Sequence, residues 1–257
     1  MIDIAVTQPF PWEQLLIYLS SRCIPNFEHV ENGSYYRAHN GKSIVVRYDP
    51  KRSLLNIEHA PDTHLKVEVV DRAKRLFFPE LPTKVIYKQL AQTLPQSQEV
   101  KGFRPLGCWD PFELCIRTII GQQVSVAAAQ TIMQRMVDRC EILTPSAVIT
   151  ANLDNMGMPG RRVQTLRKLA QAIFDGNINF AWQWSQLDSA LADIPGIGPW
   201  TRGYLAIRLG RDSDAFPETD VGLIRASGAT DAKSLLRQAE QWRPYRAYAA
   251  TCLWAMD

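Results

Sequence analysis

The hydrophobic pattern of this 257-residue chain changes near residue 100, and this change constrains its fold more than any other feature. Before that point, apolar and polar residues alternate in places, notably in residues 43–48 and 53–58, which predicts short β-strands. After it the alternation disappears, and apolar residues recur every three or four positions, as in helices. The chain is therefore expected to contain two units of different class.

Residues 1–100 are predicted to form a small α+β domain. Asn32-Gly33 and Asn40-Gly41 have the residues that two-residue hairpin turns require. Two stretches with helical periodicity interrupt the strands: residues 12–22 and residues 67–78.

Residues 101–257 are predicted to form an all-α domain. Gly121 interrupts the first helical stretch, and Gly176 has the position of a helix C-terminal stop. The expected helices are residues 110–140 with that interruption, 161–175, 200–209, 231–242 and 245–255.

Composition narrows the class of protein. An apolar share of 46% and a charged share of 21% are typical of globular proteins and exclude a disordered chain. The net charge of +3 excludes a histone-like protein. Five scattered cysteines without a CxxC pair predict neither disulfides nor a zinc or iron–sulfur site. No signal peptide and no apolar stretch of membrane-spanning length is found, so we expect a soluble cytoplasmic protein.

A short segment between two helical stretches, Ile194-Pro195-Gly196-Ile197-Gly198, contains two glycines around one apolar residue. The glycines permit backbone geometry and close approach that a Cβ would block, and the N–H groups that open the next helix favour a phosphate. The segment resembles the helix-hairpin-helix motif that binds the DNA backbone. An ordinary tight turn between helices is the alternative. Seven Lys/Arg against three Asp between positions 155 and 211 favour the DNA interpretation.

Asp220 follows the hairpin by 22 residues, within Phe216-Pro217-Glu218-Thr219-Asp220-Val221-Gly222-Leu223. Taken alone, it could be a helix N-cap. Together with the hairpin, it resembles the signature of the helix-hairpin-helix-Gly/Pro-Asp (HhH-GPD) DNA glycosylase superfamily.

Further segments resemble the DNA-3-methyladenine glycosylase II (AlkA) type of that superfamily. They are residues 9–12, 104–113, 120–127 and 242–249. The resemblance implies an α+β N-terminal domain followed by an all-α helix-hairpin-helix glycosylase domain. It also implies that Asp220 is the catalytic carboxylate, which would stabilise positive charge on the sugar and orient water after the base is flipped out of the duplex.

Two departures from other branches of the superfamily bear on the chemistry. Lyase-type relatives carry a lysine nucleophile after the hairpin, where this chain has Trp200, and no lysine lies between Lys168 and Lys233. We therefore expect a monofunctional enzyme without AP lyase activity. Some branches carry a C-terminal iron–sulfur cluster, which we do not expect after Cys252, and no cofactor is expected to be required.

Aromatic side chains are expected to form the pocket for the flipped base. By resemblance these are Trp200, Tyr204, Trp254 and Tyr18. Such a pocket favours cationic bases, by about 0.5–2 kcal/mol per cation–π contact. Burial of the two tryptophans in an ordinary core is the alternative.

Contacts with DNA are expected from a second group of residues: Gln123, Gly196, Gly198, Thr201, Arg161 and Arg162. Gln123 occupies the place of a wedging leucine in a well-known relative, although a surface glutamine is an equally simple interpretation. Arg161 and Arg162 could instead be a solvated helix start. By resemblance, a structural Na⁺ or K⁺ would bind the backbone carbonyls of Ala192, Ile194 and Ile197.

The sequence thus predicts a monomeric glycosylase that removes alkylated, cationic purines such as 3-methyladenine from double-stranded DNA in the nucleoid. The alternatives are a non-catalytic helix-hairpin-helix repair scaffold and a glycosylase for oxidised or deaminated bases. Side-chain identity leaves the choice among alkylated and deaminated bases open.

Overall fold

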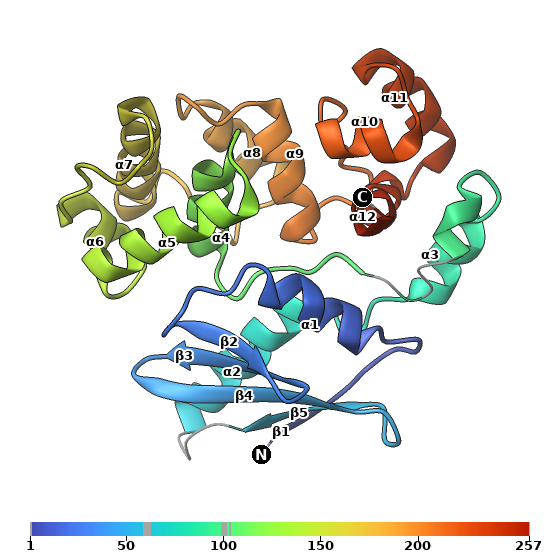
Figure 1. Cartoon of the computed structure of the whole chain (residues 1–257), viewed down its shortest axis with the longest axis horizontal. Coiled ribbons are helices and arrows are strands. Elements are labelled where there is room, and N and C mark those ends of the chain that lie inside the picture. The colour runs from blue at the N-terminus through green and yellow to red at the C-terminus, as the bar shows by residue number, and fades with distance from the viewer. Residues whose placement is uncertain (1, 59–62, 99–101, 103, 257) are drawn as a thin grey trace.

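The structure, a computed structural model, describes residues 2–58, 63–98, 102 and 104–256. The N-terminal half contains a five-stranded antiparallel sheet of order β1-β5-β4-β3-β2 (Figure 1). Its strands are β1 (Ile2–Ala5), β2 (Glu28–Glu31), β3 (Ser34–His39), β4 (Lys42–Asp49) and β5 (Leu54–Glu58). The two predicted hairpin turns are confirmed, because Asn32-Gly33 and Asn40-Gly41 join paired strands with positive φ at all four residues.

Two helices cover one face of the sheet: α1 (Trp12–Ser20) and α2 (Thr63–Phe77). Leu15 of α1 and Phe77 of α2 are fully buried against Ile44 and Ile57 of the sheet. This apolar layer forms the core of the N-terminal half and confirms its predicted α+β class.

The rest of the described chain is helical. Its α-helices are α3 (Thr83–Leu90), α4 (Pro111–Gly121), α5 (Val126–Cys140), α6 (Pro145–Thr150), α7 (Gly160–Phe174), α8 (Trp184–Ala192), α9 (Pro199–Arg208), α10 (Val221–Ser227), α11 (Ala232–Ala239) and α12 (Arg246–Met256). Two short 3₁₀-helices are η1 (Pro95–Gln98) and η2 (Glu240–Trp242).

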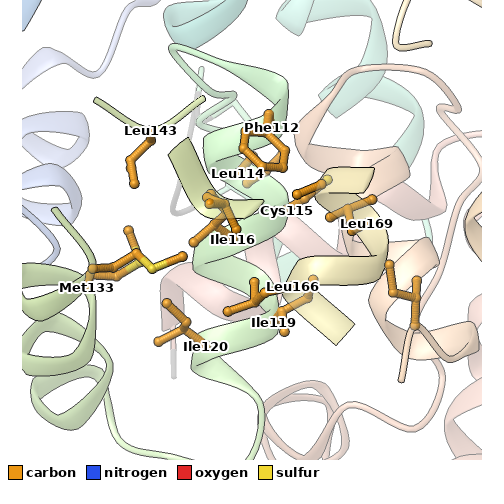
Figure 2. Close-up of a cluster of buried hydrophobic side chains, with 14 of the residues drawn as sticks. Phe112, Leu114, Cys115, Ile116, Ile119, Ile120, Met133, Leu143, Leu166 and Leu169 are labelled. Carbon is orange, nitrogen blue, oxygen red and sulfur yellow. The ribbon is translucent and has the colours of Figure 1, made fainter. Parts of the chain in front are cut away.

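Helix α4 is the centre of the larger helical core (Figure 2). Asp110 caps its first turn by accepting from the Glu113 N–H, and Pro111 occupies the first helical position. Ile116 and Ile119 are completely buried among side chains from α5 and α7. A helix that is apolar on most sides in this way must be surrounded by others, so α4 fixes the positions of its neighbours.

Helix α3 belongs by packing to the C-terminal helices, although it precedes residue 100. Its Ile86, Tyr87 and Leu90 share a buried cluster with Leu223 of α10 and Leu253 of α12. Helices α3 and α12 lie near each other at the right of the view in Figure 1. The predicted domain boundary after residue 100 lies outside the described residues and stays a prediction.

A buried network of ion pairs joins the sheet to α4. Arg37 of β3 pairs with Glu28 of β2 and with Glu113 of α4, and Arg117 of α4 also contacts both carboxylates. Burial raises the pKa of Glu113, but the adjacent Arg37 and Arg117 guanidiniums lower it further, to about 2. Each charge has an opposite partner, as burial requires.

Within the part of the chain that the structure describes, none of the helices combines the length and apolar character needed to span a bilayer. Cys108, Cys115, Cys140 and Cys252 are buried as free thiols, which agrees with their predicted role as small apolar core residues.

Candidate active site

Asp220 is held by three N–H donors. Its Oδ1 accepts from the backbone N–H of Leu223 at 2.9 Å, so Asp220 is the N-cap of α10. Its Oδ2 accepts from the indole Nε1 of Trp200 at 2.8 Å, and Oδ1 also accepts from the Nε1 of Trp254 at 3.1 Å. The N-cap alternative is therefore correct, but the two indoles add a fixed orientation that capping does not need.

The two tryptophans come from different elements. Trp200 is in the first turn of α9, where Gly198 is the N-cap and Pro199 opens the helix, and Trp254 comes from α12. The ring of Trp200 stacks on Tyr204 with centroids 5.5 Å apart and planes at 14°, while Tyr204 meets Trp254 edge-on at 5.5 Å. The structure thus brings three of the four predicted pocket aromatics and Asp220 into one contiguous group.

A cavity of about 360 Å³ lies beside this group, within the range of about 300–1,000 Å³ typical of ligand pockets. Trp200 and Tyr204 line it from α9, and Tyr18 lines it from α1. Trp254 and Asp220 are not part of the lining; Asp220 bonds to Trp200, and Trp254 packs against Tyr204. Residues of both halves of the chain thus enclose the space in which a base could be held.

The ring of Tyr18 does not fit the simple role predicted for it. The Arg22 guanidinium covers that ring at 3.8 Å from its centroid, and Arg208 donates to its hydroxyl at 2.6 Å. One π-face of the ring that was expected to attract a cationic base is therefore already used by a cation of the chain itself.

Arg208 is a cavity residue that the sequence reasoning missed. Its guanidinium donates to the hydroxyls of Tyr18 and Tyr204 and to the carbonyls of Leu106 and Gly107. The spacing could have revealed it, because Trp200, Tyr204 and Arg208 are separated by four residues each and share one face of α9.

The hairpin between α8 and α9 requires glycine at one position. Gly196 has φ of +96°, and a Cβ there would lie 2.3 Å from the Thr165 hydroxyl oxygen. Gly198 has an ordinary φ of −83° and open space around its Cβ direction. The molecule's own atoms therefore explain Gly196 but not Gly198.

Thr201 and Gln122 connect the hairpin to the turn between α4 and α5. The Gln122 amide donates to the Gly196 carbonyl at 3.1 Å and to the Thr201 hydroxyl at 3.0 Å. Thr201 is 3% exposed, so its predicted contact with DNA is replaced by this internal bond. Gln122, which the sequence reasoning did not select, holds the two loops together.

Gln123 and Arg161 are exposed, whereas Arg162 is buried. Gln123 projects from the turn after α4 with φ of +57°, and Arg161 lies in the first turn of α7. Arg162 donates to the carbonyls of Ile120 and Gln122, at 3.3 and 2.6 Å. Its guanidinium supports the turn that presents Gln123, so a phosphate contact is not the role that its surroundings favour.

The predicted cation site meets a competing positive charge. The Ile197 carbonyl faces the Nη1 of Arg202 at 3.4 Å, and the Ile194 carbonyl accepts from the Ile197 N–H at 3.0 Å. The guanidinium would repel a second cation there, so the carbonyls do not form a free cradle. The cation stays a prediction.

Two family models match the chain. Residues 116–239 match the one described as HhH-GPD superfamily base excision DNA repair protein. Residues 1–110 match the one described as AlkA N-terminal domain.

Two curated relatives are similar over nearly the whole chain. DNA-3-methyladenine glycosylase 2 of Escherichia coli (strain K12) is 29% identical over 96% of this chain and 94% of its own length. The probable bifunctional transcriptional activator/DNA repair enzyme AlkA of Mycobacterium tuberculosis (strain CDC 1551 / Oshkosh) is 29% identical over 98% of this chain. This chain spans 56% of that relative's length.

The fold is also similar to a solved structure, the 3-methyladenine DNA-glycosylase from Archaeoglobus fulgidus. The TM-score is 0.81, with 19% sequence identity over 99% of this chain and 97% of the other. At that identity the likeness concerns the fold.

Proposed function

Because the chain belongs to the HhH-GPD superfamily of base excision DNA repair proteins and carries an AlkA N-terminal domain, we propose that it is a monofunctional DNA glycosylase for alkylated purines. Bases such as 3-methyladenine would be released from double-stranded DNA. The observation that carries the proposal is the Asp220 carboxylate, fixed by Trp200, Trp254 and Leu223 beside an aromatic cavity.

The carboxylate would act on the sugar. As the bond between C1′ and the base nitrogen breaks, its electron pair leaves with the base and positive charge develops on the sugar. A carboxylate about 4 Å away stabilises such a charge by about 4 kcal/mol at an effective dielectric constant of 20. Water then adds to C1′, and Asp220 accepts the proton that the water loses.

The donors of Asp220 prevent it from turning away during this step. Both carboxylate oxygens accept N–H groups, and two of the three donors are rigid indoles that pack against Tyr204. A site arranged before the reaction does not need to reorganise as charge develops, which is the main source of electrostatic catalysis.

The residue at the lyase position supports hydrolysis without strand cleavage. Trp200 donates its indole N–H to Asp220, and an indole cannot form the imine that a lysine forms with the sugar. We propose that the product is an intact strand with an abasic site.

DNA engagement would use the exposed loops on the cavity side. Gln123 would enter the space left by the flipped base, while the open space beside Gly198 at the start of α9 would accept a phosphate. One hairpin and one cavity suffice for one lesion, so we propose that the protein acts as a monomer on DNA in the cytoplasm.

The test is release of free base from duplex DNA treated with a methylating agent, with wild type beside Asp220→Asn. Asparagine can still cap α10, so DNA binding should persist while release falls by about 100-fold or more. Asp231→Asn is the matched control, because Asp231 also caps a helix, α11, but accepts from the Ser234 N–H and not from the indoles that hold Asp220. Strand cleavage is scored on a gel without alkali. Retained release by Asp220→Asn would contradict the mechanism, and cleavage by the wild type would contradict its monofunctional character.

A further inference from the structure

The cavity beside Asp220 also carries a fixed positive charge. We call Arg208, Tyr18 and Tyr204 the Arg208 cluster, and all three line the cavity. The Nε and Nη2 of the guanidinium donate to the carbonyls of Leu106 and Gly107. Its Nη1 donates to the hydroxyls of both tyrosines. These four hydrogen bonds fix the position of the guanidinium relative to a molecule in the cavity.

The cluster lies at the opposite end of the aromatic group from the carboxylate. Asp220 bonds to the indole of Trp200, Trp200 stacks on Tyr204, and the Tyr204 hydroxyl contacts Arg208. One end of this group therefore carries a carboxylate and the other a guanidinium. As the bond breaks, positive charge on the sugar would be stabilised by the carboxylate, and negative charge on the departing base would be stabilised by the guanidinium.

The hydroxyl of Tyr18 has a hydrogen to offer. Its oxygen accepts from the Arg208 Nη1 at 2.6 Å, and the same nitrogen donates to the Tyr204 hydroxyl. Among the hydrogen bonds of the described residues, none takes up the hydrogen of Tyr18 itself. Burial raises the pKa of Tyr18, but the Arg208 and Arg22 guanidiniums lower it by more, so its net pKa lies below the usual value near 10. A more acidic hydroxyl is a stronger hydrogen-bond donor.

We propose that the Tyr18 hydroxyl, held by Arg208, is the hydrogen-bond donor to the departing base on which the release of uncharged purines depends. The inference rests on the proposed glycosylase function and adds a specificity-determining residue to it. Tyr18 would touch the base, and Arg208 would be a positioning residue that also supplies positive potential.

The chemistry differs between cationic and uncharged bases. A cationic methylated purine receives the electron pair of the C1′–N bond and leaves as a neutral molecule, so a donor gains it little. An uncharged purine receives the same pair and leaves as an anion, which the Tyr18 donor and the guanidinium stabilise. The water that adds to C1′ gives its proton to Asp220, and the purine anion takes a proton from solvent after release.

The experiment uses two duplexes that differ in one base, the uncharged purine hypoxanthine or the cationic 7-methylguanine. Tyr18→Phe removes the hydroxyl and keeps the ring. We expect single-turnover release of hypoxanthine to slow by about 10- to 100-fold, the usual effect of losing a hydrogen bond to a charged group. Release of 7-methylguanine should change less than about threefold, because a neutral leaving group does not need the donor.

Tyr36→Phe is the matched control. Tyr36 lies on β3, stacks on His29 with centroids 4.4 Å apart and is not a cavity residue, so neither rate should change. The pH profile gives a second measurement. Wild-type release of hypoxanthine should fall as rising pH removes the Tyr18 proton, and Tyr18→Phe should lack that decline.

Each other outcome has a distinct meaning. An equal loss on both substrates, or no loss on either, overturns the role of Tyr18 while the glycosylase function stands. A wild type that releases 7-methylguanine but not hypoxanthine also overturns the role of Tyr18 and leaves the glycosylase function standing. Release of neither base by the wild type contradicts the proposed function itself, and the inference with it.

Discussion

The Asp220 side chain combines a structural role with the proposed chemical role through the same two oxygens. Capping of α10 needs one acceptor, and Leu223 uses it. The indoles of Trp200 and Trp254 hold the carboxylate from two further directions. The tryptophans, which the sequence suggested as walls for the base, thus act first on the carboxylate. Of these two tryptophans, Trp200 lines the cavity and Trp254 does not.

Trp254→Phe tests the orienting role of the indole. Phenylalanine keeps an aromatic ring next to Tyr204 but removes the N–H that reaches Asp220 at 3.1 Å. We expect base release to slow by about tenfold, the value of one hydrogen bond to a charged acceptor, with DNA affinity unchanged. Trp182→Phe, on the loop between α7 and α8, is the matched control. An unchanged rate in Trp254→Phe, measured at saturating enzyme, would show that two donors suffice.

The hairpin between α8 and α9 illustrates how two similar glycines serve different ends. Gly196 fits against Thr165, whose hydroxyl also donates to the Pro195 carbonyl at 2.8 Å. Gly198 touches nothing within 4 Å of its Cβ direction. Gly196 is thus required by the fold, and Gly198 leaves open space in which the proposed DNA phosphate could bind.

Substitution by alanine should therefore separate stability from binding. Gly196→Ala introduces a strained φ and a clash with Thr165, and we expect a loss of about 1–3 kcal/mol in the free energy of unfolding. Gly198→Ala should leave that free energy unchanged but weaken binding to undamaged duplex DNA, because the new methyl group would crowd a phosphate. Urea denaturation and fluorescence anisotropy measure the two quantities. Equal DNA affinities of Gly198→Ala and wild type would contradict the phosphate role of the hairpin.

Local patterns predicted most elements because local chemistry specifies them. The turns at Asn32-Gly33 and Asn40-Gly41 need only a left-handed pair of residues, and the helical stretches appear where their periodicity predicts them, within a few residues. The predicted helix 231–242 ends earlier as an α-helix, at Ala239, and continues as the 3₁₀-helix η2. The elements given no predicted range include strand β1 and helices α3, α6, α8 and α10.

What sequence patterns could not supply is which distant side chains meet. Nothing in the local sequence of α3 indicates that Tyr87 packs with α12. In the same way, no local pattern indicates that Arg208 donates to the hydroxyl of Tyr18, 190 positions earlier in the chain. Arg162 is a charged residue in the first turn of a helix, where a solvated side chain is expected, yet it is buried under the turn before Gln123. A catalytic role for Asp220 could be proposed because the family motif carries this residue, whereas its donors depend on tertiary packing.

The two halves of the molecule enclose the cavity together, so their relative position determines its shape. Tyr18 comes from the N-terminal half, and Trp200, Tyr204 and Arg208 come from the helical half. The buried network of Glu28, Arg37, Glu113 and Arg117 joins the halves and also lines the cavity. Loss of that network should therefore affect stability and base release together.

Glu113→Gln removes the central carboxylate of this network and leaves Arg37 and Arg117 with one fewer partner each. We expect the free energy of unfolding at pH 7 to fall by about 3–5 kcal/mol, the cost of breaking a buried ion pair. Glu80→Gln is the control, because the Lys74–Glu80 pair is exposed and should contribute little.

The same network predicts how stability depends on acid. The pKa of Glu113 is about 2 in the folded protein and near its ordinary value of 4.5 in the unfolded chain. A carboxyl with a depressed pKa stabilises the fold fully above its unfolded pKa, and that contribution is lost as the pH falls from about 4.5 towards 2. Urea denaturation of wild type and Glu113→Gln across this range should give free energies that differ most at neutral pH and converge in acid. A difference that stays constant from pH 7 to pH 3 would show that Glu113 contributes through packing and not through its charge.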